Sequence, residues 1–129
     1  MARFVVVDTD VLIDFLRGRD PAADLVEGLL RDDAFLTTVI TQFEMLQGAN
    51  DPDERSRITP LFLHGQLPLT PASAARAGDL FRELRSQGAT LATADLLQAG
   101  VCLELGLPLA TKNVRHFSRV PGLEVLIPS

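Results

Sequence analysis

Three acidic residues occupy places in the sequence where their carboxylates could act together. Asp8 directly follows the apolar run 4–7, Glu44 follows a second short apolar run, and Asp95 lies near the start of an expected helix. If all three face one crevice, each pair repels by about 4 kcal/mol at about 4 Å and an effective dielectric constant of roughly 20. Retained protons or a divalent cation would make such a cluster tolerable. The pattern therefore favours a metal-binding acidic crevice.

Each acid also has a purely structural interpretation. Glu44 could complete a capping box with Thr41, and Asp95 could simply complement a helix dipole. Asp8 is harder to explain in this way, because an acid directly after four buried apolar residues is costly without a partner. Asp10 is interpreted as a possible helix cap and Asp14 as a solvated residue one turn later.

The available side chains favour Mg²⁺ or Mn²⁺ over zinc. Hard cations take oxygen ligands such as carboxylates. The chain has one cysteine, Cys102, and two histidines, His64 and His116, so it offers no cysteine and histidine set for zinc. Cys102 lies in an apolar helical run and is expected to be a core residue.

Alternating strands and helices are expected to position the acids. The predicted strands are 4–7, 34–38, 67–69, 109–111 and 123–127. The predicted helices are 11–16, 21–31, 41–48, 53–63 with Pro60 as a weak point, 71–87, 93–105 and a short turn at 113–117.

This order predicts an α/β fold, a three-layer α/β/α sandwich with a mainly parallel central sheet. Residues 1–129 form one expected domain without a repeat or linker. In such sheets ligands bind beyond the carboxyl ends of the strands, and Asp8 stands at such an end.

Charge and hydropathy limit the possible functions. The 129 residues include 12 basic and 17 acidic side chains, a net charge of −5, which argues against a general nucleic-acid binder with a basic surface. The acids are concentrated early, whereas residues 105–129 are basic. No run approaches the roughly 18 apolar residues of a membrane span. A cytoplasmic protein without a membrane partner is expected.

Four segments, in order, resemble those of PIN-domain proteins. They are VVVDTDVLID at 5–14, TQFEMLQG at 41–48, TADLLQA at 93–99, and LATKNVRHF at 109–117 with VPGL at 120–123. Together, in a lone domain of this length, they resemble the VapC-like toxins, the ribonuclease halves of toxin–antitoxin pairs.

The resemblance implies a Mg²⁺- or Mn²⁺-dependent endoribonuclease with Asp8, Glu44 and Asp95 as metal ligands. Asn113 matches a further catalytic position and can offer an oxygen or orient a water. His116 stands where the family often has a fourth acid, which leaves open a one-metal site or a two-metal site completed by substrate. Possible RNA contacts are Lys112, Arg115, His116 and Arg119; an ordinary solvated turn is the alternative for this segment.

The resemblance also implies a homodimer and a cognate antitoxin whose tail occupies the acidic groove. Other classes remain open at this stage. Asp8 and Asp10 fit a haloacid-dehalogenase-type phosphatase, but Val11 replaces the expected Gly-Thr continuation. A receiver-like signalling domain would need an aspartate after the strand at 67–69, where Thr70 stands. A catalytically inactive PIN-like binding module is the third alternative.

Overall fold

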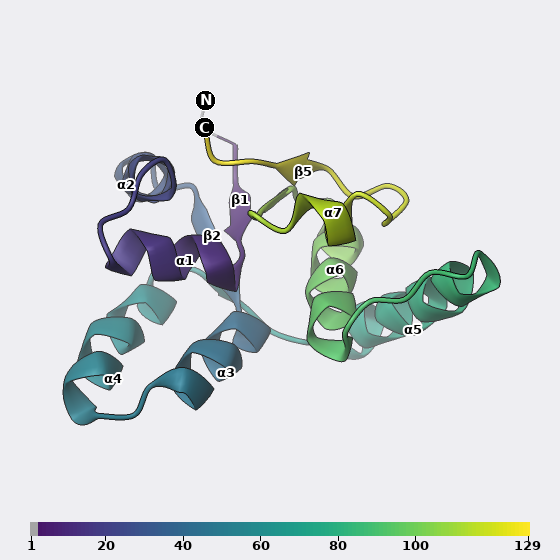
Figure 1. Cartoon of the computed structure of the whole chain (residues 1–129), viewed down its shortest axis with the longest axis horizontal. Helices are drawn as coiled ribbons and strands as arrows, with labels where there is room; N and C mark the ends of the chain where they lie inside the picture. The colour runs from purple at the N-terminus through teal and green to yellow at the C-terminus, as the bar shows by residue number, and fades with distance from the viewer. Residues whose placement is uncertain (1–2) are drawn as a thin grey trace.

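A sheet of five strands lies at the centre of the computed structural model, which describes residues 3–129 (Figure 1). The strands are β1 (Val5–Val7), β2 (Phe35–Thr38), β3 (Gln66–Leu67), β4 (Leu109–Ala110) and β5 (Val125–Leu126). Their spatial order is β3-β2-β1-β4-β5, and every pairing is parallel. Val6 of β1 aligns with Leu36 on one side and Leu109 on the other. The predicted parallel sheet is confirmed, with β1 in its middle.

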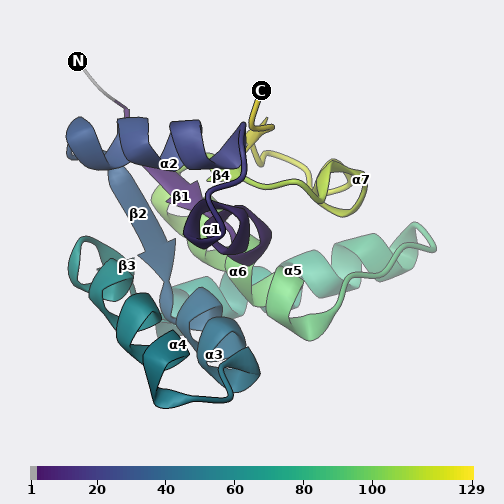
Figure 2. The same ribbon diagram turned by 60° about the vertical axis from the view of Figure 1, so that its left-hand side comes forward.

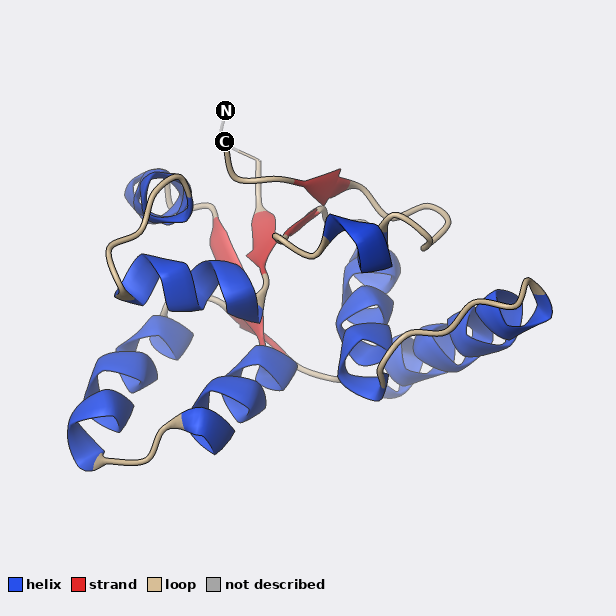
Figure 3. Cartoon of the chain, in the orientation of Figure 1, coloured by secondary structure: helices blue, strands red, loops and turns tan. Residues whose placement is uncertain are grey.

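Helices cover both faces of this sheet (Figure 3). The first group consists of α1 (Thr9–Leu16), α2 (Ala22–Arg31), α3 (Val39–Gly48), α4 (Pro52–Ile58) and the 3₁₀ helix η1 (Thr59–Leu63). The second group consists of α5 (Pro71–Ser86), α6 (Thr93–Leu105) and the short α7 (Val114–Phe117).

The side chains of β1 alternate between the two faces of the sheet, which explains why helices are needed on both faces. Val6 is fully buried in a cluster with Leu80 of α5 and Ala99 of α6. Its neighbour Val7 is buried in a separate cluster, with residues of α1 to α4. Because successive strand side chains point to opposite faces, an all-apolar strand needs cover above and below. The two cores confirm the three-layer α/β/α sandwich.

Helices α5 and α6 approach each other closely at one glycine. A Cβ on Gly100 would lie 2.6 Å from the Ser73 carbonyl oxygen and 2.9 Å from Ala77 Cβ. A side chain there would separate the two helices, so the contact requires glycine. This contact fixes α6, the helix that carries Asp95.

Several predicted element ends differ from the observed ones. Phe4 lies outside β1 and is 51% exposed. The helix predicted over 53–63 divides at Thr59 into α4 and η1. Pro60 lies at the start of η1, and its missing N–H cannot continue the α-helical ladder.

The two ends of the described chain lie at the same end of the molecule (Figure 2). The two terminal guanidinium nitrogens of Arg3 each donate to one oxygen of the Glu124 carboxylate at 2.9 Å, which connects Arg3 to the segment before β5. No helix within residues 3–129 has both the length and the apolar character needed to cross a bilayer.

Candidate active site

Asp8 lies at the carboxyl end of the central strand and is 7% exposed. It is the N-cap of α1, and its Oδ1 accepts the Thr9 N–H at 2.9 Å. Two side chains donate to it as well: Gln98 Nε2 to Oδ1 at 3.1 Å and Thr111 Oγ1 to Oδ2 at 2.7 Å. Neither Gln98 nor Thr111 was predicted as a site residue. These donors supply the partners that the sequence indicated Asp8 must have.

The pKa of the Asp8 carboxyl is raised to about 6, chiefly by burial and in addition by the charges of Asp10 and Asp95. The hydrogen bonds from Thr111 and Thr9 act in the opposite direction, since they favour the ionised form. The carboxylate is therefore well hydrogen-bonded but lacks a compensating positive charge.

Glu44 lies in the second turn of α3, not in its first turn as predicted. The helix begins at Val39, and its N-cap is Thr38, whose hydroxyl accepts the Thr41 N–H at 3.1 Å. The predicted capping box of Thr41 with Glu44 is therefore wrong. The Glu44 carboxylate instead accepts a hydrogen bond of 2.6 Å from Thr9 Oγ1, which places it over the start of α1.

Asp95 lies in the first turn of α6, as predicted, but Thr93 is not the cap of this helix. Ala92 occupies the N-cap position and makes no side-chain cap bond. Burial raises the pKa of Asp95, and so do the charges of Glu44 and Asp10, whereas His116 lowers it. Asp8, Asp10, Glu44 and Asp95, here called the acidic cluster, thus lie within electrostatic range of one another in several pairs.

Asp10 and Asp14 differ from their predicted roles. Asp8, not Asp10, caps α1, and Asp10 Oδ2 instead accepts the backbone N–H of Lys112 at 3.0 Å. Asp14 is not a free solvated residue, because Lys112 Nζ lies 2.7 Å from its Oδ2. This ion pair holds the pKa of Asp14 below its ordinary value. Lys112, in the connection between β4 and α7, is therefore attached to α1 through both its backbone and its side chain.

The predicted RNA contacts lie around α7. Asn113 is its N-cap residue, and its side-chain amide lies 2.8 Å from His116 Nδ1. Arg119 donates to the Thr90 carbonyl at 3.2 Å, and Arg115 is exposed on the helix. The Lys112 ammonium is engaged with Asp14, whereas the exposed Arg115 forms no ion pair within residues 3–129.

The donor chemistry of the acidic cluster fits a divalent cation of the hard class. Its four members offer only carboxylate oxygens. Burial, and then repulsion between neighbouring carboxylates, raises the pKa of Asp8 and Asp95. No three His, Cys, Asp or Glu side chains in the described chain stand ready as a group to hold a metal ion. Binding would therefore require water ligands or inward rotation of side chains.

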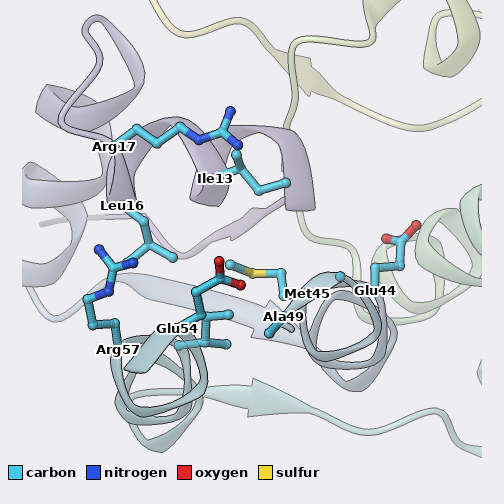
Figure 4. A pocket seen from close by; sticks show the side chains of 10 residues that line it. Ile13, Leu16, Arg17, Glu44, Met45, Ala49, Glu54 and Arg57 are labelled. Atoms are coloured by element: carbon cyan, nitrogen blue, oxygen red, sulfur yellow. The ribbon is translucent and has the colours of Figure 1, made fainter. Parts of the chain in front are cut away.

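A pocket of about 260 Å³ lies between α1, α3 and α4, and Glu44 belongs to its lining (Figure 4). Its apolar wall includes Ile13 and Met45. Arg17 and Arg57 lie on the side of the pocket opposite Glu44. Glu54 also lines the pocket. The acidic cluster thus continues into a groove with an apolar wall and, away from Glu44, two arginines and one further acid.

The family is established by comparison with known proteins. The model of the PIN domain matches residues 5–123. The chain belongs to the PIN-domain family. This assignment separates it from the phosphatase and receiver classes.

Relatives within the PIN family narrow the assignment. Ribonuclease VapC10 of Mycobacterium tuberculosis is 33% identical over 124 residues, which cover 96% of this chain and 91% of that protein. Ribonuclease VapC19 of the same species is 30% identical over 121 residues, covering 92% and 96%. This PIN domain is therefore a homologue of the VapC ribonucleases.

Solved structures show the same fold. A DNA-bound VapBC from Salmonella typhimurium superposes with a TM-score of 0.86 at 20% identity, over 99% of this PIN domain and all of that chain. VapBC-1 from nontypeable Haemophilus influenzae superposes with a TM-score of 0.81 at 26% identity, over 96% and 97% of the two chains.

Proposed function

We propose that this PIN domain is a Mg²⁺- or Mn²⁺-dependent endoribonuclease and the toxin of a toxin–antitoxin pair. The observation that carries the proposal is the acidic cluster at the carboxyl ends of the parallel strands. Asp8 and Asp95 both have raised pKa values because they are buried beside other carboxylates. A bound cation would relieve this repulsion, and the VapC relatives are named ribonucleases.

Asp8, Glu44 and Asp95 would hold the cation. When bound, a divalent cation makes water more acidic and neutralises charge that develops on a phosphodiester. Asp8 suits the central position, because its hydrogen bonds to Thr9, Gln98 and Thr111 fix its side chain. Asp95 and Glu44 approach from α6 and α3 and complete the acidic face.

Glu44 is the member of the cluster best placed to orient an attacking water. Its Oε1 accepts from Thr9 Oγ1, its Oε2 has no donor among residues 3–129, and the side chain borders the open pocket. Asn113 and His116 hold each other across the start of α7 and would contact the RNA from the other side. Arg115 and Arg119 add positive charge there, where the phosphate backbone would lie.

The pocket beside Glu44 suits the tail of a cognate antitoxin. The superposed structures from Salmonella and Haemophilus are described as VapBC assemblies. An apolar side chain would fill the wall formed by Ile13 and Met45, acidic groups would pair with Arg17 and Arg57, and a basic side chain would reach Glu44. Such a tail would cover the acidic cluster and exclude RNA.

A second copy of the chain is the proposed occupant of an apolar surface at the start of α3 and α6. The surface forms a hollow of about 470 Å³ lined by Val39, Ile40, Phe43, Leu69, Thr93, Ala94 and Leu97. Phe43 belongs to this lining and is 64% exposed, so a large apolar side chain faces solvent in a lone monomer. We expect Phe43→Glu to convert a dimer into a monomer in light scattering. A monomeric wild-type protein would contradict this assignment.

Reaction products separate the proposal from its rivals. The purified protein is incubated with Mn²⁺ and a labelled RNA, with DNA of the same sequence, and separately with acetyl phosphate. The proposal expects internal cuts in RNA, intact DNA and no change of protein mass. A stable phosphoryl adduct would contradict the proposal. Intact RNA and an unchanged mass would support an inactive binding module.

A further inference from the structure

We propose that Gln98 is a positioning residue that holds Asp8 and, through two threonine hydroxyls, Glu44. The inference rests on the proposed function, because Asp8 and Glu44 are the expected ligands of the cation. Gln98 is the polar exception in the buried stretch of α6 that also contains Ala99, Gly100, Val101 and Cys102. It is 1% exposed, so its amide must find partners inside the protein.

The first link of this arrangement is direct. Gln98 Nε2 donates to Asp8 Oδ1 at 3.1 Å. The other end of the amide is anchored, because Oε1 accepts the hydroxyl of Thr38 at 2.5 Å. Thr38 is the N-cap of α3, so its own position is fixed by the helix start. The amide therefore cannot turn over without breaking bonds at both ends.

The second link leads to Glu44. Gln98 Nε2 also donates to Thr41 Oγ1 at 2.9 Å, and Thr41 Oγ1 lies 3.1 Å from Thr9 Oγ1. Thr9 Oγ1 in turn lies 2.6 Å from Glu44 Oε1. A hydroxyl carries one proton, so when Thr9 donates along this short contact the Thr41 proton bridges the two hydroxyls. The hydrogen bonds then run in one direction, from the Gln98 amide through the Thr41 and Thr9 hydroxyls to the Glu44 carboxylate.

The two links share one amide group and end on two different carboxylates. All these groups are buried or half-buried, and every buried polar side-chain atom of the described chain has a partner. Loss of the amide would leave Asp8 Oδ1 and Thr41 Oγ1 without this donor. Both expected ligands would then gain freedom to rotate, which weakens a site that depends on their positions.

The test compares Gln98→Met, which keeps the volume and removes the hydrogen bonds, with Val101→Ala. Val101 is equally buried on α6 and serves as the control for lost packing. Mn²⁺ affinity of the metal-free protein is measured by calorimetry, and kcat and KM are measured on RNA. We expect Gln98→Met to weaken Mn²⁺ binding by about 10- to 100-fold and to lower kcat with little change in KM. Val101→Ala should bind Mn²⁺ as the wild type does.

Thr41→Val provides a second variant that keeps the Gln98–Asp8 bond and interrupts the path to Glu44. We expect a smaller loss of Mn²⁺ affinity than for Gln98→Met, and less than additive losses in the double variant. Equal Mn²⁺ affinity of Gln98→Met and Val101→Ala would overturn the assignment of Gln98. If Gln98→Met does not fold, an unchanged Mn²⁺ affinity of Thr41→Val would overturn it. A wild-type protein that binds no Mn²⁺ and cuts no RNA would instead refute the proposed function.

Discussion

Thr111 Oγ1 donates a hydrogen bond of 2.7 Å to Asp8 Oδ2, and this bond joins the end of β4 to the end of β1. The same oxygen accepts the Asn113 N–H at 3.0 Å, so one buried hydroxyl connects Asp8 to the turn that begins α7. The predicted metal ligand and the predicted RNA-contact segment are thus attached to each other through Thr111.

Replacing Thr111 by valine should destabilise the protein. The variant removes the donor to Asp8 Oδ2 and leaves that buried oxygen unpaired, which costs about 1–3 kcal/mol. The loss should be largest above the Asp8 pKa of about 6, where the carboxylate is ionised. Urea unfolding at pH 7.5 measures it. Thr111→Ser keeps the hydroxyl and should stay close to the wild type; an equal loss in both variants would show that the methyl group matters instead.

The raised pKa of Asp8 predicts how stability changes with pH in the absence of metal. The carboxyl binds a proton more tightly in the folded state, with a pKa of about 6, than in the unfolded chain, where the ordinary value is 3.8. Asp8 therefore imposes no penalty below about pH 4 and a growing one up to about pH 7. By linkage the penalty is of order 3 kcal/mol.

Asp8→Asn removes this ionisation, so the variant should be more stable than the wild type at pH 7.5 in chelator. The advantage should shrink as the pH falls towards 4. Urea titrations at several pH values check both statements. A variant that is less stable at pH 7.5 would indicate that the hydrogen bonds of the carboxylate outweigh its cost of burial.

The close contact of α5 and α6 predicts opposite effects for two glycines. Gly100→Ala should cost about 1–3 kcal/mol, because the new Cβ would meet the Ser73 carbonyl oxygen at 2.6 Å. Gly78→Ala should stabilise α5 by about 0.5–1 kcal/mol, since no atom lies within 4 Å of its Cβ position. Thermal unfolding of the two variants measures the difference. Equal stabilities would contradict the packing described here.

Arg115 and Lys112 should differ in their importance for RNA binding. Arg115 is exposed on α7, whereas the Lys112 ammonium already pairs with Asp14. Arg115→Gln should weaken binding uniformly across sequences and reduce the slope of log affinity against log salt by about 1. Lys112→Gln should change the slope less. Fluorescence anisotropy with a labelled RNA at several salt concentrations tests this order, and the reverse order would refute it.

The sequence indicated the layers of the fold well, because the apolar run at β1 and the alternation of strands and helices depend on local patterns. The ends of elements were less predictable. Thr41 and Glu44 have the spacing of a capping box. Thr38, three residues earlier, is also a threonine, and it is the residue that caps α3. A choice between two such threonines depends on tertiary contacts, here the bond from Thr38 to Gln98.

The sequence pointed to the candidate acids, but not to the residues that support them. Asp8 and Asp95 could be selected from the sequence because one directly follows a predicted strand and the other lies near the start of a predicted helix. Thr111 and Gln98 contact Asp8 from 103 and 90 residues away, which no local pattern reveals. For Gln98 a signal was present, since a single amide in an apolar helical stretch needs a buried partner.

Cleavage of a 5′-labelled RNA by acid-to-amide variants tests the central claim most directly. Wild type, Asp8→Asn, Glu44→Gln and Asp95→Asn are compared with Mg²⁺ or Mn²⁺ and again with excess chelator. The acidic cluster predicts cleavage by the wild type only with the cation, and losses in the order of 100-fold or more in each variant while the fold stays intact by circular dichroism. Undiminished cleavage by Asp8→Asn, or by wild type in chelator, would contradict a metal-dependent acidic site.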